Sequence, residues 1–349
     1  MSRRLPTLLT ATGVGLAFFA TALSAESLVV SNWDGYMAPD AIDSFNAASG
    51  NSAELVLHGT NEEIMGKLIA SKGKGYDVVF VSSPFAEVLN NLGLAETLDH
   101  SKIPNIANLY KEATELEHDP GNSFSVPYAW GTTGLCYRSD LLTDTPDSWM
   151  DLLAPADDVA GKTTMLATDR WLLAAGFLAK GYSVNETDAG KLAEVRDLLI
   201  AAKKTLLAYD DATFYAKLVS GEAELVHAWD GWCNYGIAEN ADIKYTIPAE
   251  GSDLWVDTMV IMKGSQNKEE AYAFVNFILD PKNHGWAAEN ILYKVPNEPA
   301  MAALSADLIA AYPNMGMTPD NLIAFEQLRD VGEATRSYAR AVSEIKAAN

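Results

Sequence analysis

Apolar runs and amphipathic segments alternate along the first hundred residues. Residues 27–31, 53–58 and 76–81 are short, strand-like apolar runs. Residues 39–49 and 61–72 carry apolar side chains at helical spacing, with Pro39 at the start of the first and Asn61 as the cap of the second, and a further helix ends at Gly93. Strands and helices that alternate at this spacing predict a parallel sheet with helices packed on its faces.

A second series of strands and helices begins after Pro127. The strand-like runs are 132–137, 162–166, 224–229, 244–247 and 254–262, and the helical segments are 172–180, 192–203, 214–218, 271–279 and much of the C-terminal third. No Gly/Ser-rich linker separates the two series. We therefore expect two α/β lobes that are joined by strands and not by a flexible tether.

Residues 1–25 have the pattern of a secretory signal peptide. Arg3 and Arg4 form a basic start, and residues 8–22 form an apolar, small-residue segment. Cleavage fits after either Ala22 or Ala25, and an uncleaved anchor is the alternative. Removal of this segment leaves a chain that we expect to be soluble and exported into a bacterial periplasm.

Composition and charge narrow the functional classes. The 349 residues are 48% hydrophobic and 21% charged, which is typical of a globular protein. The formal net charge of −22 argues against nucleic-acid binding, which requires a basic face. The two cysteines, Cys136 and Cys233, exclude a disulfide scaffold; they form either one disulfide after export or two buried thiols.

No catalytic motif is present in the sequence. The five histidines form neither HExxH nor HxxEH, and no GxSxG motif occurs. We therefore expect no enzymatic activity, no bound metal and no cofactor.

Aromatic residues next to aspartates form the candidate binding site. They lie at the ends of strands, and ligands bind beyond the strand ends in parallel sheets. Ring faces and carboxylates together are the groups that bind an organic ammonium ion. The alternative is that the Trp residues fill the core and the Asp residues cap helices and turns. The candidate ligand-binding residues are Trp33, Asp34, Tyr36, Ser83, Asp169, Trp171, Trp229, Asp230, Trp232, Trp255, Asp257 and Tyr293.

Several of these residues belong to a longer pattern. Over essentially the whole mature chain, the sequence resembles the polyamine-binding proteins, of spermidine/putrescine type, of bacterial ABC importers. The resemblance is carried by Asn32, Trp33 and Tyr36, and by residues 76–79, 126–134, 228–229, 255–257, 268–271, 280–281, 293 and 296–297.

The resemblance implies a two-lobed periplasmic-binding-protein fold, in which each lobe is a mostly parallel sheet flanked by helices. The lobes are hinged and close over a ligand. The chain leaves the first lobe near Trp130 and returns near Asp257, so we expect lobe 1 to comprise 26–131 and 258–302 and lobe 2 to comprise 132–257 and 303–349. The implied partners are a small organic cation and the membrane permease of an ABC importer, and we expect a monomer.

The sequence departs from the family pattern at two positions. A family glutamate falls at Trp171, and an acidic or polar position of the first loop falls at Gly35, next to Asp34. Asp230 is a candidate substitute for a missing acid. Fewer acids favour a putrescine-like ligand over a spermidine-like one and leave room for a quaternary ammonium, a betaine or an ω-amino acid that uses Arg170.

Overall fold

A single ten-stranded sheet runs through the described part of the molecule. The structure is a computed structural model that describes residues 27–348; the predicted signal peptide lies outside the described residues. The strands are β1 (Leu28–Asn32), β2 (Ala53–Leu57), β3 (Val78–Ser82), β4 (Val126–Arg138), β5 (Thr163–Met165), β6 (Leu206–Tyr209), β7 (Leu225–Trp229), β8 (Ile243–Thr246), β9 (Asp253–Ile261) and β10 (Glu326–Gln327). Their order is β2-β1-β3-β9-β4-β7-β5-β6, with β10 paired to β9 and β8 paired to β4.

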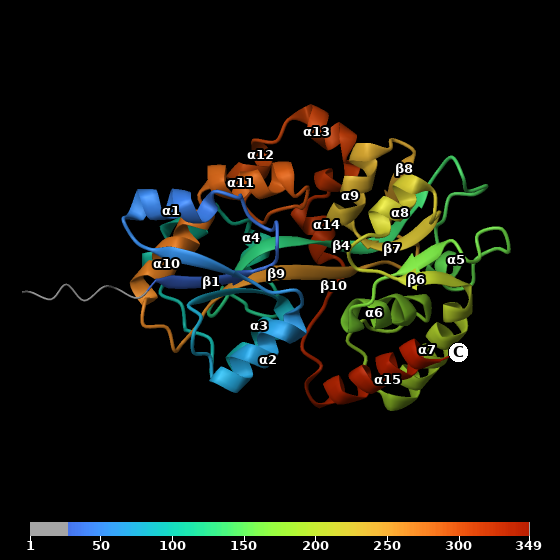
Figure 1. Ribbon diagram of the computed structural model, residues 1–349, viewed down its shortest axis with the longest axis horizontal. Helices are drawn as coiled ribbons and strands as arrows, with labels where there is room; N and C mark the ends of the chain where they lie inside the picture. Colours follow the sequence, from blue (N-terminus) through green and yellow to red (C-terminus); the bar gives the residue numbers. More distant parts are fainter. Residues whose placement is uncertain (1–26, 349) are drawn as a thin grey trace, which may run out of the picture.

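The first three strands form the predicted parallel sheet, because β1 pairs in parallel with both β2 and β3. Helices cover both faces, as Figure 1 shows, with α1 (Ala41–Ser49) above the strands and α2 (Asn61–Ser71) and α3 (Ser83–Asn91) below. Alternation along β3 explains this arrangement, since Val79 and Val81 pack in the cluster of α2 and α3 while Phe80 packs in the larger core on the other face.

The prediction that Asn61 caps α2 is wrong. Thr60 is the N-cap, and its hydroxyl accepts a hydrogen bond from the Glu63 N–H at 3.1 Å. The Asn61 side chain is instead buried, where it accepts a hydrogen bond from the Ser82 N–H and donates one to the Ser82 hydroxyl, both at 3.0 Å. It therefore links the start of α2 to the end of β3.

The long strands β4 and β9 join the two halves of the sheet. β9 runs antiparallel to both β3 and β4. The first half of β4 pairs with β9, and its second half pairs with β7 and β8. The predicted strand of residues 132–137 is confirmed, but its predicted start is too late, because β4 begins at Val126 and contains Pro127. The register of pairing shifts between Pro127 and Ala129, and such an irregularity accommodates a residue without an N–H.

The second half of the sheet has parallel pairs of its own, β5 with β6 and β5 with β7. The sequence pattern did not indicate β6 and β10, which form through their pairing with β5 and β9. The helices that surround this half are α5 (Trp149–Leu153), α6 (Asp169–Ala179), α7 (Ala189–Ala202), α8 (Phe214–Ser220), α9 (Asp230–Glu239) and α15 (Thr335–Ala347).

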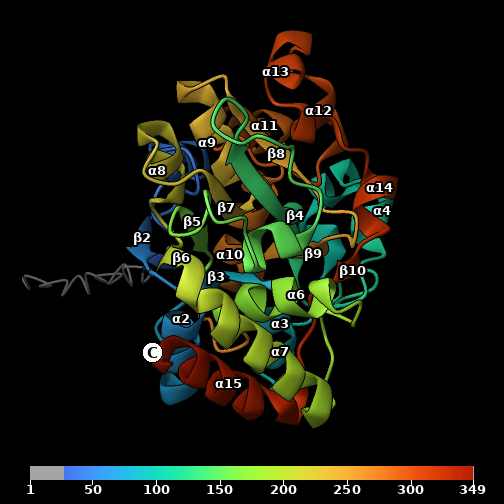
Figure 2. The same cartoon turned by 90° about the vertical axis from the view of Figure 1, so that its right-hand side faces the viewer.

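The remaining helices complete both ends of the molecule. α15 packs against α6 and α7, and in both Figure 1 and Figure 2 it lies at the opposite end from α12 and α13. The other helices are α4 (Lys111–Thr114), α10 (Lys268–Ile278), α11 (Pro281–Asn290), α12 (Glu298–Ala302), α13 (Ala306–Ala311) and α14 (Pro319–Ile323), with 3-10 turns at His100–Lys102, Pro104–Asn108, Lys203–Thr205, Pro313–Gly316 and Gly332–Ala334.

The two cysteines form a disulfide, which decides between the two alternatives left open by the sequence. Cys136 of β4 is bonded to Cys233 of α9, with the Cα atoms 5.8 Å apart. The bond closes a loop with a sequence separation of 97 residues. A cross-link over a loop of this length restricts the unfolded chain strongly.

We expect the oxidised protein to be more stable than the reduced protein by about 2–5 kcal/mol. Denaturant unfolding with and without dithiothreitol measures this difference. The double variant Cys136→Ser/Cys233→Ser is the control, and it should unfold at the same denaturant concentration under both conditions. Equal midpoints for the oxidised and reduced wild-type protein would show that the disulfide contributes nothing.

Candidate functional site

A carboxylate on β9, that of Asp257, is the centre of the candidate site. It accepts hydrogen bonds from the Tyr36 hydroxyl at 2.7 Å and from the Ser82 hydroxyl at 2.6 Å. Ser82 is also the residue that pairs with Asp257 across the β3–β9 ladder. Because the amide of Asn61 donates to the Ser82 hydroxyl, that hydroxyl has its own proton free for Asp257.

The Asp257 carboxylate has hydrogen-bond donors but no cation. Within residues 27–348, no Lys, Arg or His forms an ion pair with it. Burial raises the pKa of Asp257 to about 6, although the hydrogen bonds from Ser82 and Tyr36 lower it. A carboxylate held in this way gains most from a cation that enters with a ligand.

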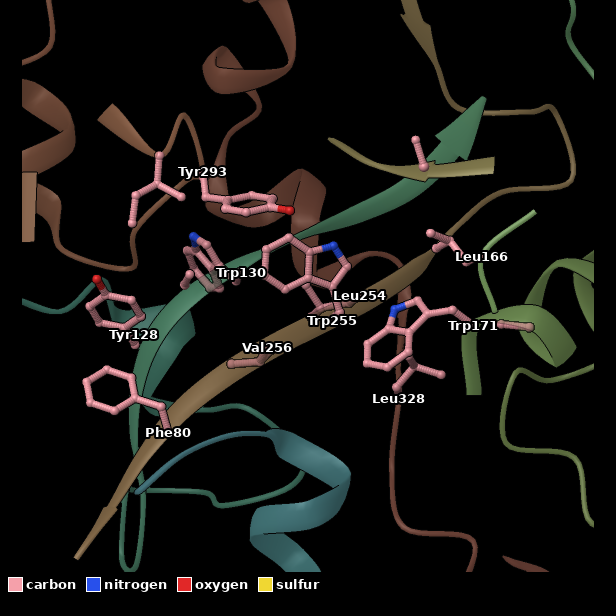
Figure 3. Close-up of a cluster of buried hydrophobic side chains, with 14 of the residues drawn as sticks. Phe80, Tyr128, Trp130, Leu166, Trp171, Leu254, Trp255, Val256, Tyr293 and Leu328 are labelled. Atoms are coloured by element: carbon pink, nitrogen blue, oxygen red, sulfur yellow. The ribbon is translucent and has the colours of Figure 1, made fainter. Parts of the chain in front are cut away.

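The ring of Tyr36, whose hydroxyl donates to this carboxylate, belongs to an aromatic cluster. The Tyr36 ring lies edge to face with the rings of Trp33 and Tyr128, each with centroids 5.4 Å away, and with Tyr293 at 6.0 Å. The Tyr293 and Trp255 centroids are 5.1 Å apart. Figure 3 shows Trp255 projecting from β9 toward Tyr293. Trp255 and Asp257 share one face of β9, as strand alternation predicts.

Two glycines allow these rings to approach the backbone closely. A Cβ atom on Gly231 would overlap the Tyr293 ring, and one on Gly131 would overlap both the Trp255 ring and the Asp230 carboxylate. The Trp255 ring and the Asp230 carboxylate therefore lie next to each other above β4.

The irregular segment after α11 places Tyr293. The Trp130 N–H donates to the Lys294 carbonyl at 3.1 Å, and the Asn234 amide donates to the Leu292 carbonyl at 2.9 Å. Leu292 adopts a left-handed conformation with φ of 58°. Tyr293 is thus fixed between β4 and α9.

The structure pairs Asp230, the candidate substitute acid, with a cation of the protein itself. Its carboxylate binds the Lys294 ammonium, and both side chains are only 1% exposed. It also accepts hydrogen bonds from the Thr132 N–H at 3.2 Å and from the Gly231 N–H at 2.8 Å. Asp230 is therefore already compensated in the absence of a ligand.

The second half of the sheet supplies a further group of rings. Trp171 of α6 is 3% exposed and lies edge to face with Trp229, with centroids 5.6 Å apart. The Trp171 indole N–H has no hydrogen-bond partner among the described residues. Trp232 instead faces Tyr215 and Tyr235, at 5.5 and 5.3 Å, and so packs away from Asp257.

Three predicted residues lie outside this arrangement. Asp34 is exposed, and Asp169 is half-buried with its carboxylate 3.6 Å from the Lys346 ammonium. Ser83 is fully buried, and its hydroxyl donates to the Leu328 carbonyl at 3.2 Å. The neighbouring Ser82, which was not predicted, makes the contact with Asp257.

Arg170 is also turned away from the aromatic site. Its guanidinium donates to the Asn185 side chain at 2.7 Å and lies 5.2 Å from the Tyr338 ring centroid. It therefore supports the packing of α6 against α15.

Two residues outside the first loop, neither of them predicted, support it. The Tyr128 hydroxyl donates to the Tyr36 carbonyl at 2.5 Å, and the His58 ring lies 4.9 Å from the Trp33 ring. Burial lowers the pKa of His58 to about 4, so the ring beside Trp33 is neutral at physiological pH. Tyr128 lies within the motif of residues 126–134, but no sequence signal identifies its contact.

Residues 27–348 contain no cluster of His, Cys, Asp and Glu side chains that could hold a metal ion. In the same part of the chain, no helix has the length and apolar character needed to cross a bilayer.

Comparison with known proteins assigns the chain to a family. The family model of the bacterial extracellular solute-binding proteins matches residues 40–316. The chain belongs to this family. Its relatives are binding proteins and not enzymes.

Individual relatives match over most of their length. The chain is 31% identical to a putrescine/cadaverine-binding protein of Pseudomonas aeruginosa, over 86% of this chain and 88% of that protein. It is 28% identical to a spermidine/putrescine-binding periplasmic protein of Salmonella typhimurium, over 94% of each.

A solved structure confirms the fold. The substrate-binding protein of the spermidine/putrescine ABC transporter of Streptococcus pneumoniae superposes with a TM-score of 0.77 at 28% identity, covering 92% of this chain and 99% of that one. The predicted two-lobed fold and the predicted resemblance to spermidine/putrescine-type binding proteins are thus confirmed.

The raised pKa of Asp257 gives a prediction for the ligand-free solute-binding protein. Its folded-state pKa of about 6 lies above the ordinary value of 3.8, so between these pH values the folded state binds more protons than the unfolded state. Stability contributed by this group is therefore lost as pH rises from about 4 to about 6. Asp257→Asn should remove this loss and raise Tm at pH 7, by about 2–4 °C for each kcal/mol recovered.

A matched control is Asp119→Asn. The Asp119 carboxylate accepts hydrogen bonds from the backbone N–H groups of Ser123, Phe124 and Ser125, so its replacement should lower Tm. Scanning calorimetry at several pH values measures both variants. If Asp257→Asn lowers Tm as Asp119→Asn does, Asp257 is a structural aspartate.

Proposed function

We propose that this protein is the periplasmic solute-binding component of an ABC importer and that it captures a polyamine, with putrescine preferred over spermidine. The observation that carries the proposal is the Asp257 carboxylate, which is bonded to one ring of an aromatic cluster and has no cation partner among residues 27–348. The named relatives bind putrescine, cadaverine or spermidine, and this supports the same ligand class here.

The chemistry of the site suits an alkyl ammonium ion. An ammonium group that replaces its hydration shell with the Asp257 carboxylate makes a charge-assisted hydrogen bond. The faces of Trp255, Tyr293 and Tyr36 add cation–π attraction of about 0.5–2 kcal/mol each and cover the methylene chain. A ligand held in this way bridges residues on the first loop, on β9 and on the segment after α11.

Closure of the two lobes would complete the site. Trp33, Tyr36 and Ser82 belong to the first half of the molecule and Trp171 and Trp229 to the second, whereas Asp257 lies on β9, the strand between β3 and β4 at the centre of the sheet. We propose that the lobes comprise 26–131 with 258–302 and 132–257 with 303–349, so that β4 and β9 act as hinge strands. Rotation about these strands would bring the second group of rings over the ligand.

The number of free acids favours a short ligand. Asp257 is enclosed and unpaired, Asp230 is neutralised by Lys294, and Asp169 lies beside Lys346. Each further ammonium group of a longer polyamine would need its own partner, because a buried charge without one is costly. Putrescine carries one charge fewer than spermidine and therefore loses less binding free energy to unpaired charges in this site.

The alternative ligands are less well supported. An ω-amino acid needs a cation for its carboxylate, but the Arg170 guanidinium is held by Asn185 and the Lys294 ammonium by Asp230. A quaternary ammonium or a betaine would fit the rings, but it cannot donate a hydrogen bond to Asp257. An exported enzyme is disfavoured because the family consists of binding proteins.

The remaining parts of the proposal concern location and partners. We propose that residues 1–25 direct export and are removed, and that the mature monomer delivers its ligand to a membrane permease. The net charge of −22 attracts cations to the protein and repels nucleic acids.

We expect the wild-type protein to bind putrescine more tightly than spermidine, and Asp257→Asn to weaken putrescine binding by about 2–5 kcal/mol. Calorimetric titration at pH 8 and at pH 5 measures both effects. Wild-type affinity should fall below pH 6, where protonation of Asp257 competes with the ligand, whereas the affinity of the variant should not change with pH in this range. Unchanged affinity in Asp257→Asn would remove this residue from the site, and tighter binding of spermidine would refute the preference.

Substitution of Trp171 tests whether the second group of rings lines the ligand-binding cleft. Trp171→Glu should raise the affinity for putrescine, because a carboxylate there would pair with the second ammonium. Titration with putrescine and with butylamine, which lacks the second charge, separates this effect from a general change of the cleft. Trp232→Glu is the control, since that ring packs against Tyr215 and Tyr235. Unchanged putrescine affinity in a folded Trp171→Glu protein would make Trp171 a packing residue.

A further inference from the structure

The buried ion pair between Lys294 and Asp230 links segments that are far apart in the sequence. Lys294 belongs to the segment that carries Tyr293, and Asp230 begins α9, directly after Trp229. Both side chains are 1% exposed. Among residues 27–348, Asp230 is the one hydrogen-bond partner of the Lys294 ammonium.

This pair lies beside the proposed ligand site. The Asp230 carboxylate and the Trp255 ring approach the same point above Gly131. Tyr293 is close to both acids: its ring lies 6.0 Å from that of Tyr36, whose hydroxyl donates to Asp257, and it packs against Gly231, the residue after Asp230. The site therefore contains two carboxylates near one ring, and one of them already holds an ammonium group.

The carboxylate does not need the lysine to hold its position. The N–H groups of Thr132 and Gly231 and the Thr132 hydroxyl all donate hydrogen bonds to Asp230. A buried ion pair also adds little net stability, because desolvation of both charges offsets their attraction. The main effect of Lys294 is therefore that the negative charge of Asp230 is no longer available to a ligand.

We propose that Lys294 determines the specificity of the site. Its ammonium group pairs with the Asp230 carboxylate, which would otherwise bind the second ammonium group of a polyamine. This inference rests on the proposed function. Of the two acids near Tyr293, Lys294 leaves only Asp257 without a cation, and so it selects against ligands with several charges. Removal of Lys294 would open a second ammonium site at Asp230.

The test compares putrescine with butylamine, which has the same carbon chain and one ammonium group. In Lys294→Ala, the ratio of putrescine affinity to butylamine affinity should rise about tenfold or more, because only the diamine can also pair with Asp230. The double variant Asp230→Asn/Lys294→Ala should not show this rise. Lys67→Ala, which removes a lysine from an exposed pair with Glu63, changes the net charge equally and should leave the ratio unchanged.

Two further measurements keep the inference testable if the Lys294→Ala protein does not fold. Lys294→Gln removes the charge but keeps a hydrogen-bond donor for Asp230, and its ratio should change in the same direction. In the absence of polyamine, methylammonium chloride should raise the Tm of the single variant that folds, Lys294→Ala or Lys294→Gln, more than potassium chloride does, and it should not do so for Asp230→Asn/Lys294→Ala.

An unchanged affinity ratio in folded single variants, or an equal rise in the double variant, would overturn the inference. A wild-type protein that binds neither amine would instead refute the proposed function. In that case the Tm measurement with methylammonium tests the inference by itself. A larger rise in Tm with methylammonium chloride than with potassium chloride supports an ammonium site at Asp230, and equal rises exclude it.

Discussion

The hydrogen bonds to the Asp257 carboxylate connect the first loop, β3 and β9. Asn61 orients Ser82, Ser82 donates to Asp257, and Tyr36 donates to the same carboxylate. The donors keep the acid in place, but they do not replace a counter-ion, and burial therefore raises its pKa. The ligand-free protein thus holds an acid whose charge is under-compensated, and this is the condition under which an entering ammonium gains most.

The two central acids differ because of what surrounds them. Asp257 has hydroxyl donors and rings, whereas Asp230 has backbone donors and a buried lysine. The Tyr293-Lys294 segment supplies both a ring of the site and the cation that neutralises the second acid. This one segment therefore influences both the shape and the charge of the site, and its anchoring to β4 at Trp130 couples it to the strand that joins the lobes.

Periodicity predicted the βα order, and strand alternation placed Trp255 and Asp257 on one face, because both properties are local. Pairing across the fold was not accessible. Lys294 and Asp230 are 64 residues apart, and no local pattern indicates that they meet. Ser82, and not Ser83, reaches Asp257 because the strand register decides which side chain faces β9. Pro127 lies within β4 because irregular pairing accommodates it, and a local pattern cannot show this.

A crystal structure of the protein grown with putrescine at pH 8 tests the central claim most directly. We predict that one ligand nitrogen lies about 2.7–2.9 Å from an Asp257 carboxylate oxygen, with the methylene chain against Trp255 and Tyr293 and with Lys294 still on Asp230. A ligand bound elsewhere, or an Asp257 carboxylate that contacts only Tyr36 and Ser82 while the ligand is present, would contradict the account.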